Sequence, residues 1–116
     1  MHRAVVALFS LAPIAVGACA GAPTARPASS APLLFVTNEV SNDLSIVDTG
    51  RDEVVGTIAV GKRPWGIGLS PDGKRLFAAN GPSDDVSVVD LDAEKEVARI
   101  RAGEGPWGIA VVTVVR

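Results

Sequence analysis

Residues 34–69 read LFVTNEVSNDLSIVDTGRDEVVGTIAVGKRPWGIGL, and residues 76–111 read LFAANGPSDDVSVVDLDAEKEVARIRAGEGPWGIAV. The two stretches align without a gap at an offset of 42 residues, beginning with Leu34 and Leu76. Strand-rich units that repeat every ~40–45 residues are typical of β-propeller blades. The sequence therefore predicts an all-β region at 33–116 that holds two repeats, 34–75 and 76–116.

Each repeat divides into strand-like segments that fit a four-stranded antiparallel blade. Glycine is frequent in the WGIGL segment, and it suits the innermost strand because neighbouring blades converge at the propeller axis. The chain begins at the second strand of one blade and ends with a lone inner strand, so the sequence predicts eight strands and an incomplete propeller. The segments, from the inner to the outer strand of the complete blade, are WGIGL (65–69), LFAAN (76–80), DVSVVDL (85–91) and KEVARI (95–100), with WGIAVV (107–112) as the lone strand.

Charge and composition exclude several classes of function. The chain has 11 basic and 13 acidic side chains, a balance without the basic surface of a nucleic-acid-binding protein. Its single cysteine, Cys19, and its single histidine, His2, leave the repeats without a disulfide, a zinc cluster or a His-dependent nucleophile. We therefore expect no catalytic residues, no metal site, no cofactor and no enzymatic activity.

The N-terminal third predicts export. A short basic start and an uncharged apolar run precede Val16-Gly17-Ala18-Cys19, which resembles the lipobox of bacterial lipoproteins. This resemblance implies a signal peptide at 1–18, lipidation of Cys19 and a membrane attachment through that lipid. The alternative is ordinary signal-peptidase cleavage near the same place. Residues 19–32, rich in Ala, Pro and Ser, predict a low-complexity tether. Either alternative places the protein in the periplasm or on the outer membrane of a bacterium.

The repeats resemble the YVTN-type β-propeller family. LFVTN at 34–38 matches the YVTN motif with Phe35 in place of Tyr, and the Pro-Trp-Gly-Ile runs continue the resemblance. ANGPSDDVSVVD and GPWGIAVV are similar to a periplasmic subgroup associated with PQQ-dependent alcohol catabolism. Proteins related to this family include quinoprotein amine dehydrogenase heavy chains and the haem d1 domain of nitrite reductase. The haem activity would need an axial histidine, which the repeats lack.

The number of blades departs from this family, whose members close a ring of about seven. A blade buries its apolar faces only against neighbours, so two blades need further partners. Three interpretations remain open. The chain is a shortened remnant, or it assembles with itself as a trimer of six blades or a tetramer of eight, or it pairs with another propeller or periplasmic protein.

Propeller geometry predicts that the loops at 38–42 and 80–84 share one face of the molecule with the links at 61–64 and 103–106. We expect a binding site on this face. Asn38 and Asn80 also fit a role in their own turns, Asp48 and Asp90 fit caps of the turns that follow them, and the tryptophans fit a seal between blades. The candidate binding residues on this face are Asn38, Asn42, Asp43, Lys62, Arg63, Trp65, Asn80, Asp84, Asp85, Glu104 and Trp107.

The function that the sequence favours is a non-catalytic, exported binding or scaffold module, lipid-anchored in the cell envelope. One alternative is an accessory of PQQ-dependent alcohol oxidation. The other is a truncated propeller remnant without independent function.

Overall fold

The computed structural model describes residues 30–115, and these residues form β-strands and turns. The predicted signal peptide and Cys19 lie outside this range, as does most of the predicted tether. The described residues contain no helix long and apolar enough to cross a membrane. The strands are β1 (Leu33–Asn38), β2 (Asp43–Asp48), β3 (Glu53–Ala59), β4 (Pro64–Leu69), β5 (Arg75–Asn80), β6 (Asp85–Asp90) and β7 (Lys95–Arg101).

The strands form two antiparallel meanders, which confirm the predicted fold class. One sheet has the order β1-β2-β3 and the other β4-β5-β6-β7, so each strand pairs with its neighbours in sequence. The register also repeats, since Leu34 pairs with Val47 in the first sheet and Leu76 with Val89 in the second. A β-bulge follows Ile46 in the first sheet and Val88, its repeat equivalent, in the second. The 42-residue repeat of the sequence is thus a structural repeat of one blade.

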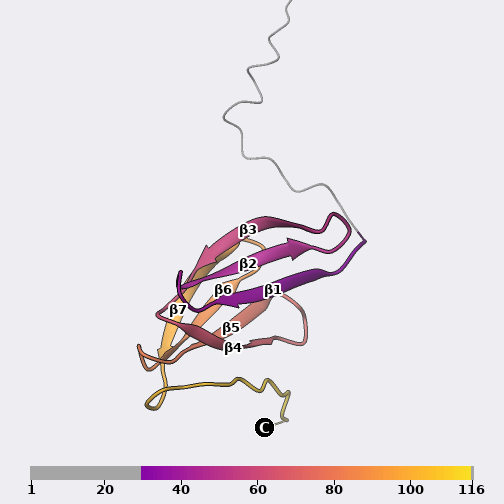
Figure 1. Ribbon diagram of the computed structural model, residues 1–116. Coiled ribbons are helices and arrows are strands. Elements are labelled where there is room, and N and C mark those ends of the chain that lie inside the picture. The colour runs from indigo at the N-terminus through magenta and orange to yellow at the C-terminus, as the bar shows by residue number, and fades with distance from the viewer. Residues whose placement is uncertain (1–29, 116) are drawn as a thin grey trace, which may run out of the picture.

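The eighth strand predicted at 107–112 does not form. This segment is extended but carries no strand, although it runs beside β4 (Figure 1). A β-carbon added at Gly66 would lie 2.5 Å from the Trp107 carbonyl oxygen, which shows how closely the two segments approach. An inner strand becomes a strand by pairing with the second strand of its own blade, as β4 pairs with β5. Segment 107–112 has no such partner within the described part of the chain, and this is why the prediction fails.

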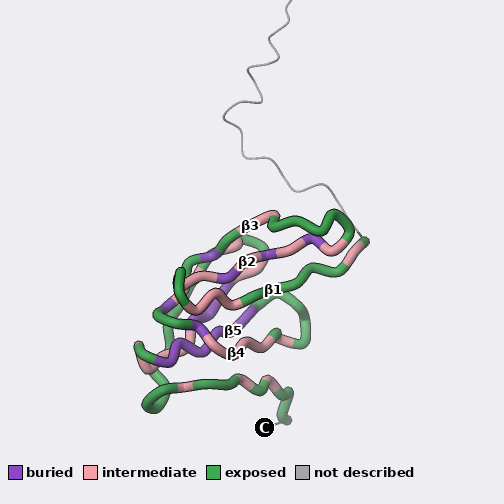
Figure 2. The backbone as a smooth tube through the Cα atoms, viewed as in Figure 1, coloured by how far each residue is buried: buried purple, intermediate pink, exposed green. Residues whose placement is uncertain are grey.

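The two sheets stack face to face, with β1 against β4 and β3 against β7 (Figure 1). The core lies between them, and the buried stretches concentrate in the middle strands of each sheet (Figure 2). Aliphatic side chains fill this space without a large aromatic residue at its centre, as the Val- and Ile-rich composition predicts. The core residues are Leu44, Ile46 and Ile58 from the first sheet, and Leu76, Ala78 and Val89 from the second.

The turns after β2 and β6 are fixed by two aspartates at the same repeat position. The Asp48 carboxylate accepts hydrogen bonds from the backbone N–H groups of Gly50 and Arg51, at 2.8 and 3.2 Å. The Asp90 carboxylate does the same for Asp92 and the residue after it, at 2.9 and 3.1 Å. Both aspartates therefore have the capping role that the sequence predicts for them.

Candidate functional site

Loops from the two sheets meet at one end of the molecule. The Asn42 side-chain oxygen accepts a hydrogen bond of 2.9 Å from the Arg63 backbone N–H. At the equivalent place in the second repeat, the Asp84 carboxylate accepts one of 2.9 Å from Gly105. The loops after β1 and β5 thus fix the links after β3 and β7. This is the arrangement of loops that propeller geometry predicts.

Four of the predicted site residues form side-chain hydrogen bonds within their own blades. The Asn38 side-chain amide donates to the Asp43 carboxylate and to the Ser45 hydroxyl, both at 2.8 Å. The equivalent amide of Asn80 donates to the Asp85 carboxylate at 2.8 Å and to the Ser87 hydroxyl at 2.9 Å. These pairs join the ends of adjacent strands, so they stabilise the strand ends next to the loops.

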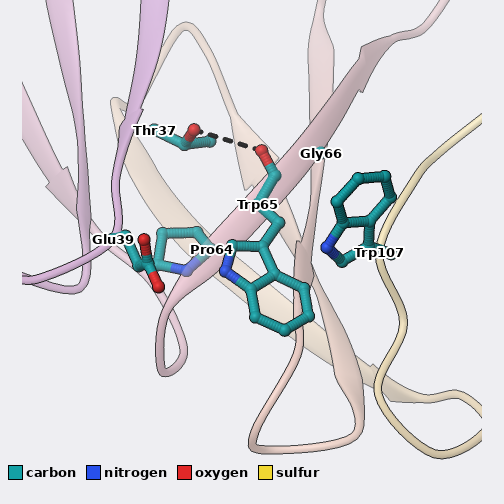
Figure 3. A pocket seen from close by; sticks show the side chains of 6 residues that line it. All are labelled: Thr37, Glu39, Pro64, Trp65, Gly66 and Trp107. Carbon is teal, nitrogen blue, oxygen red and sulfur yellow. Dashed lines mark hydrogen bonds between the residues drawn. The ribbon is translucent and has the colours of Figure 1, made fainter.

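Both tryptophans line one pocket at the loop end, with a volume of about 600 Å³. Trp65 belongs to β4 and Trp107 to the extended C-terminal segment, and Figure 3 shows their rings turned toward each other. The ring centroids lie 6.3 Å apart at an interplanar angle of 69°, a favourable edge-to-face geometry. We call this the tryptophan pocket; its residues are Thr37, Glu39, Pro64, Trp65, Gly66 and Trp107.

The pocket is anchored differently on its two sides. The Thr37 hydroxyl donates a 3.1 Å hydrogen bond to the Trp65 carbonyl oxygen, which ties the first sheet to β4 (Figure 3). The Trp65 ring packs so closely on Gly81 that an added β-carbon there would lie 2.4 Å from the ring. Trp107, by contrast, is 74% exposed. One indole is therefore fixed by packing, and the other presents most of its surface to solvent.

A charged pair stands beside Trp65. The Arg63 guanidinium lies 5.9 Å from the Trp65 ring centroid and forms an ion pair with the Glu39 carboxylate. Its Nε donates to that carboxylate at 2.8 Å. The hydrogen bond from Arg63, followed by one from the Trp65 side chain and the Arg63 charge, lowers the pKa of Glu39 below its ordinary value of 4.5. Glu39 is therefore ionised at neutral pH.

Arg63 adopts a left-handed backbone conformation, with φ of 51°. Its repeat equivalent, Gly105, has φ of 60°, so the fold requires this conformation at both links. A residue with a β-carbon is strained there, whereas glycine is not. The first link thus keeps an arginine at a position suited to glycine, and that arginine reaches the pocket.

The structure divides the predicted site residues into three groups. Trp65 and Trp107 line the pocket and Arg63 stands at its rim; Lys62 and Asn42 join Arg63 in a neighbouring hollow of about 610 Å³. Glu104 is exposed on its loop and lines neither hollow. The remaining residues are engaged in the strand-end and loop hydrogen bonds: Asn38, Asp43, Asn80, Asp84 and Asp85.

Sequence reasoning missed Glu39, the acidic residue of the pocket. A signal was present, because the equivalent position of the second repeat is Gly81. A charged residue opposite glycine at equivalent repeat positions marks a place where the two blades differ. Thr37 was missed in the same way, since Ala79 is its equivalent. Differences between repeats are thus as informative about the site as the matches are about the fold.

The pocket combines aromatic surface with polar groups that already have partners. The tryptophan pocket offers an exposed indole surface, a carboxylate already paired with arginine, and a hydroxyl that is already donating. Among residues 30–115, no three His, Cys, Asp or Glu side chains lie together as metal ligands would. Stacking and edge-to-face contacts are what this pocket can supply.

Stacked antiparallel meanders that converge on glycine-rich inner segments, with loops gathered at one end, define a β-propeller repeat protein. The family model described as "YNCE-like beta-propeller" matches residues 4–114, and the chain belongs to this family. The propeller resemblance read from the repeats is thereby confirmed. The likeness to the PQQ-associated subgroup stays a prediction.

Solved structures show the same fold. The hydrazine synthase of Kuenenia stuttgartiensis is 36% identical with a TM-score of 0.64, over 66% of this chain and 22% of the other. The dihydro-heme d1 dehydrogenase NirN is 29% identical with a TM-score of 0.57, over 74% of this chain and 19% of the other. A protein of unknown function from Desulfotomaculum acetoxidans, 18% identical with a TM-score of 0.61 over 69% and 28%, shares the fold. No curated protein sequence matches the chain.

This chain therefore spans about a fifth of the length of the hydrazine synthase and NirN chains that it matches.

Proposed function

We propose that this chain is a non-catalytic, exported binding module of the bacterial cell envelope, attached through a lipid on Cys19. Its tryptophan pocket binds a small ligand that carries a flat, conjugated ring. The observation that supports this function is the exposed indole of Trp107 beside the fixed indole of Trp65, whose centroids lie 6.3 Å apart. Exposed aromatic surface next to a fixed aromatic wall favours a flat partner.

Two further features support a ligand of this shape. The pocket volume of about 600 Å³ lies in the usual range of small-molecule sites, roughly 300–1,000 Å³. In addition, one structural relative is a dihydro-heme d1 dehydrogenase, whose name gives a flat macrocycle as the molecule it handles. The non-catalytic assignment rests on the lack of a histidine in the repeats and on the engaged state of the pocket's polar groups.

The test uses the chain's own fluorescence. Trp65 and Trp107 are the only tryptophans and the chain has no tyrosine, so emission reports on the pocket alone. PQQ and metal-free protoporphyrin are titrated as flat conjugated probes. We expect saturable quenching by at least one of them, and we expect Trp107→Ala to abolish saturation of the remaining Trp65 emission.

Val112→Ala is the matched control, because Val112 is 73% exposed on the same segment but does not line the pocket. This variant should bind like the parent chain. Quenching that never saturates, or that is the same in both variants, overturns the proposed function. Saturation by PQQ alone would favour the role as an accessory of PQQ-dependent alcohol oxidation.

A further inference from the structure

The buried interface between the two sheets has a counterpart on each outer face of the molecule. Ile58 of the first sheet is 1% exposed and Leu76 of the second is 0% exposed, because the two sheets cover them. Their repeat equivalents, Ile100 and Leu34, lie on the opposite outer faces and are 54% and 50% exposed. Within residues 30–115, both outer faces therefore present half of the apolar interface that is buried between the two sheets.

Glycines at equivalent repeat positions also differ in their neighbours, since one pair is closely packed and the other is open. A β-carbon at Gly61 would lie 2.4 Å from the Asn80 side chain, and one at Gly66 would lie 2.5 Å from the Trp107 carbonyl oxygen. Close packing of the following blade thus requires glycine at both positions. Their repeat equivalents are Gly103 and Gly108, where an added β-carbon would meet no atom of the described part of the chain within 4 Å. Glycine stands at these two positions as it would if another blade packed there.

The hydrogen bonds across the internal interface define what that blade has to offer. The Gly61 N–H donates to the buried hydroxyl of Ser87 at 3.2 Å. The equivalent donor is Gly103, and the equivalent acceptor is Ser45 on the open side of the first sheet. The two outer faces of one chain therefore carry the two matching halves of the same contact.

The unformed eighth strand points to the same partner. β1 pairs with β2 along one edge, and no strand pairs with its other edge in the described residues. Translating the β4–β5 register by one repeat matches Pro106 with Asn38 and Ile109 with Val36, as Pro64 pairs with Asn80 and Ile67 with Ala78. Segment 106–111 of one chain thus has the sequence and the extended shape to become the missing inner strand of another chain's first blade.

We propose that copies of this chain assemble head to tail, with the C-terminal face and segment 106–111 of one copy docking on β1 and the open face of the next. Contacts of this heterologous type close into a ring when their rotation allows it. Three copies supply six blades and four supply eight, both within the ordinary range of propellers. This inference does not depend on the ligand of the tryptophan pocket.

Assembly also completes the mouth of the pocket. Trp107, which is 74% exposed, would lie beside Trp65 of the next copy, which would cover part of the indole surface that the proposed ligand contacts. The indoles would then alternate around the axis. The match is not perfect, because Trp65 packs on Gly81 whereas the equivalent position is Glu39.

The first test joins the copies covalently. In the full chain with Cys19→Ser, Val36→Cys and Ile109→Cys are combined and oxidised. We expect a ladder of disulfide-linked chains on a non-reducing gel, ending at three or four. Ile67→Cys with Ala78→Cys, a pair that the structure places opposite each other within one chain, should oxidise without a change in mass. Val40→Cys with Ile109→Cys controls for random collision, since Val40 is 95% exposed on a loop.

The second test measures absolute mass by light scattering. We expect three or four times the 11.9 kDa of one chain, and we expect Gly108→Ala to reduce this to one. This variant should fold normally, because the added methyl group meets no atom within 4 Å among residues 30–115. Leu34→Glu should also disperse the ring, whereas Val54→Glu should not, because the second repeat already carries Glu96 at that position. A parent chain that is a monomer, a mass unchanged by Gly108→Ala, or cross-linking no greater than in the Val40 control overturns the proposal.

Discussion

Leu76 and Leu34 provide the sharpest test of how this molecule is held together, because they occupy the same position in two repeats and differ in their neighbours. Leu76 is 0% exposed between the sheets, and Leu34 is 50% exposed on the outer face. Truncating a fully buried leucine removes its transfer free energy and leaves a cavity, which together cost about 2–5 kcal/mol. Leu76→Ala should therefore lower the free energy of unfolding by about 3 kcal/mol.

Leu34→Ala removes the same atoms from a half-exposed site, where the truncation leaves no enclosed cavity. Only about half of the transfer free energy is lost, or about 1 kcal/mol. Both values come from urea denaturation followed by tryptophan emission, at the lowest usable protein concentration so that contacts between copies are dissociated. The free energy of unfolding of Leu34→Ala should therefore exceed that of Leu76→Ala by about 2 kcal/mol.

A cost below about 1 kcal/mol for Leu76→Ala would refute the packed interface from which every later inference starts. Raising the protein concentration gives a second reading of the same pair. If copies assemble, the cost of Leu34→Ala rises with concentration, since Leu34 then becomes buried, and that of Leu76→Ala changes less.

Other expected outcomes follow from hydrogen bonds and charges. Asn80→Ala should destabilise the fold by about 2 kcal/mol and Asn38→Ala by about 1 kcal/mol. The two side-chain amides make equivalent hydrogen bonds, but Asn80 is fully buried, so its loss costs more. Urea denaturation of the dilute protein measures both costs, and equal values would contradict this reasoning. The pKa of Glu39 is lowered, so its ion pair with Arg63 should persist from neutral pH down to 4.5 and be lost as the pH falls further through the lowered pKa. Tryptophan emission should change in that acidic range and not above it, and Glu39→Gln should remove the transition. Cys19→Ala should abolish metabolic labelling with fatty acids, and a labelled Cys19→Ala protein would disprove lipidation at that residue.

The fold could be predicted from the sequence to a considerable depth because a propeller blade is a local structure. Its strands pair with their neighbours in sequence, so alternation and turn residues define them without reference to the rest of the chain. The two sheets, their antiparallel order, the turn caps at Asp48 and Asp90, and the meeting of loops at one end all follow from the repeat.

The candidate site was only partly predictable for the opposite reason. Trp65 and Trp107 stood out because they recur, and Arg63 was included with its loop. Glu39 and Thr37 join the site only through contacts with Arg63 and Trp65, 24 and 28 residues away in the sequence. Contacts at that separation depend on how the blades stack, and the pattern within one repeat carries no record of it.

The sequence by itself determined the blade: a 42-residue unit, its strands, its turns and the glycines of its inner strand. The tertiary structure alone decided which copy of each repeated residue is buried. Leu34 and Leu76 are the same residue in the same repeat position, yet one is half exposed and the other fully enclosed. It also decided that segment 107–112 forms no strand. The physical reason is common to both results: burial and strand pairing belong to a residue and its neighbour together, and two repeats with the same residues can have different neighbours.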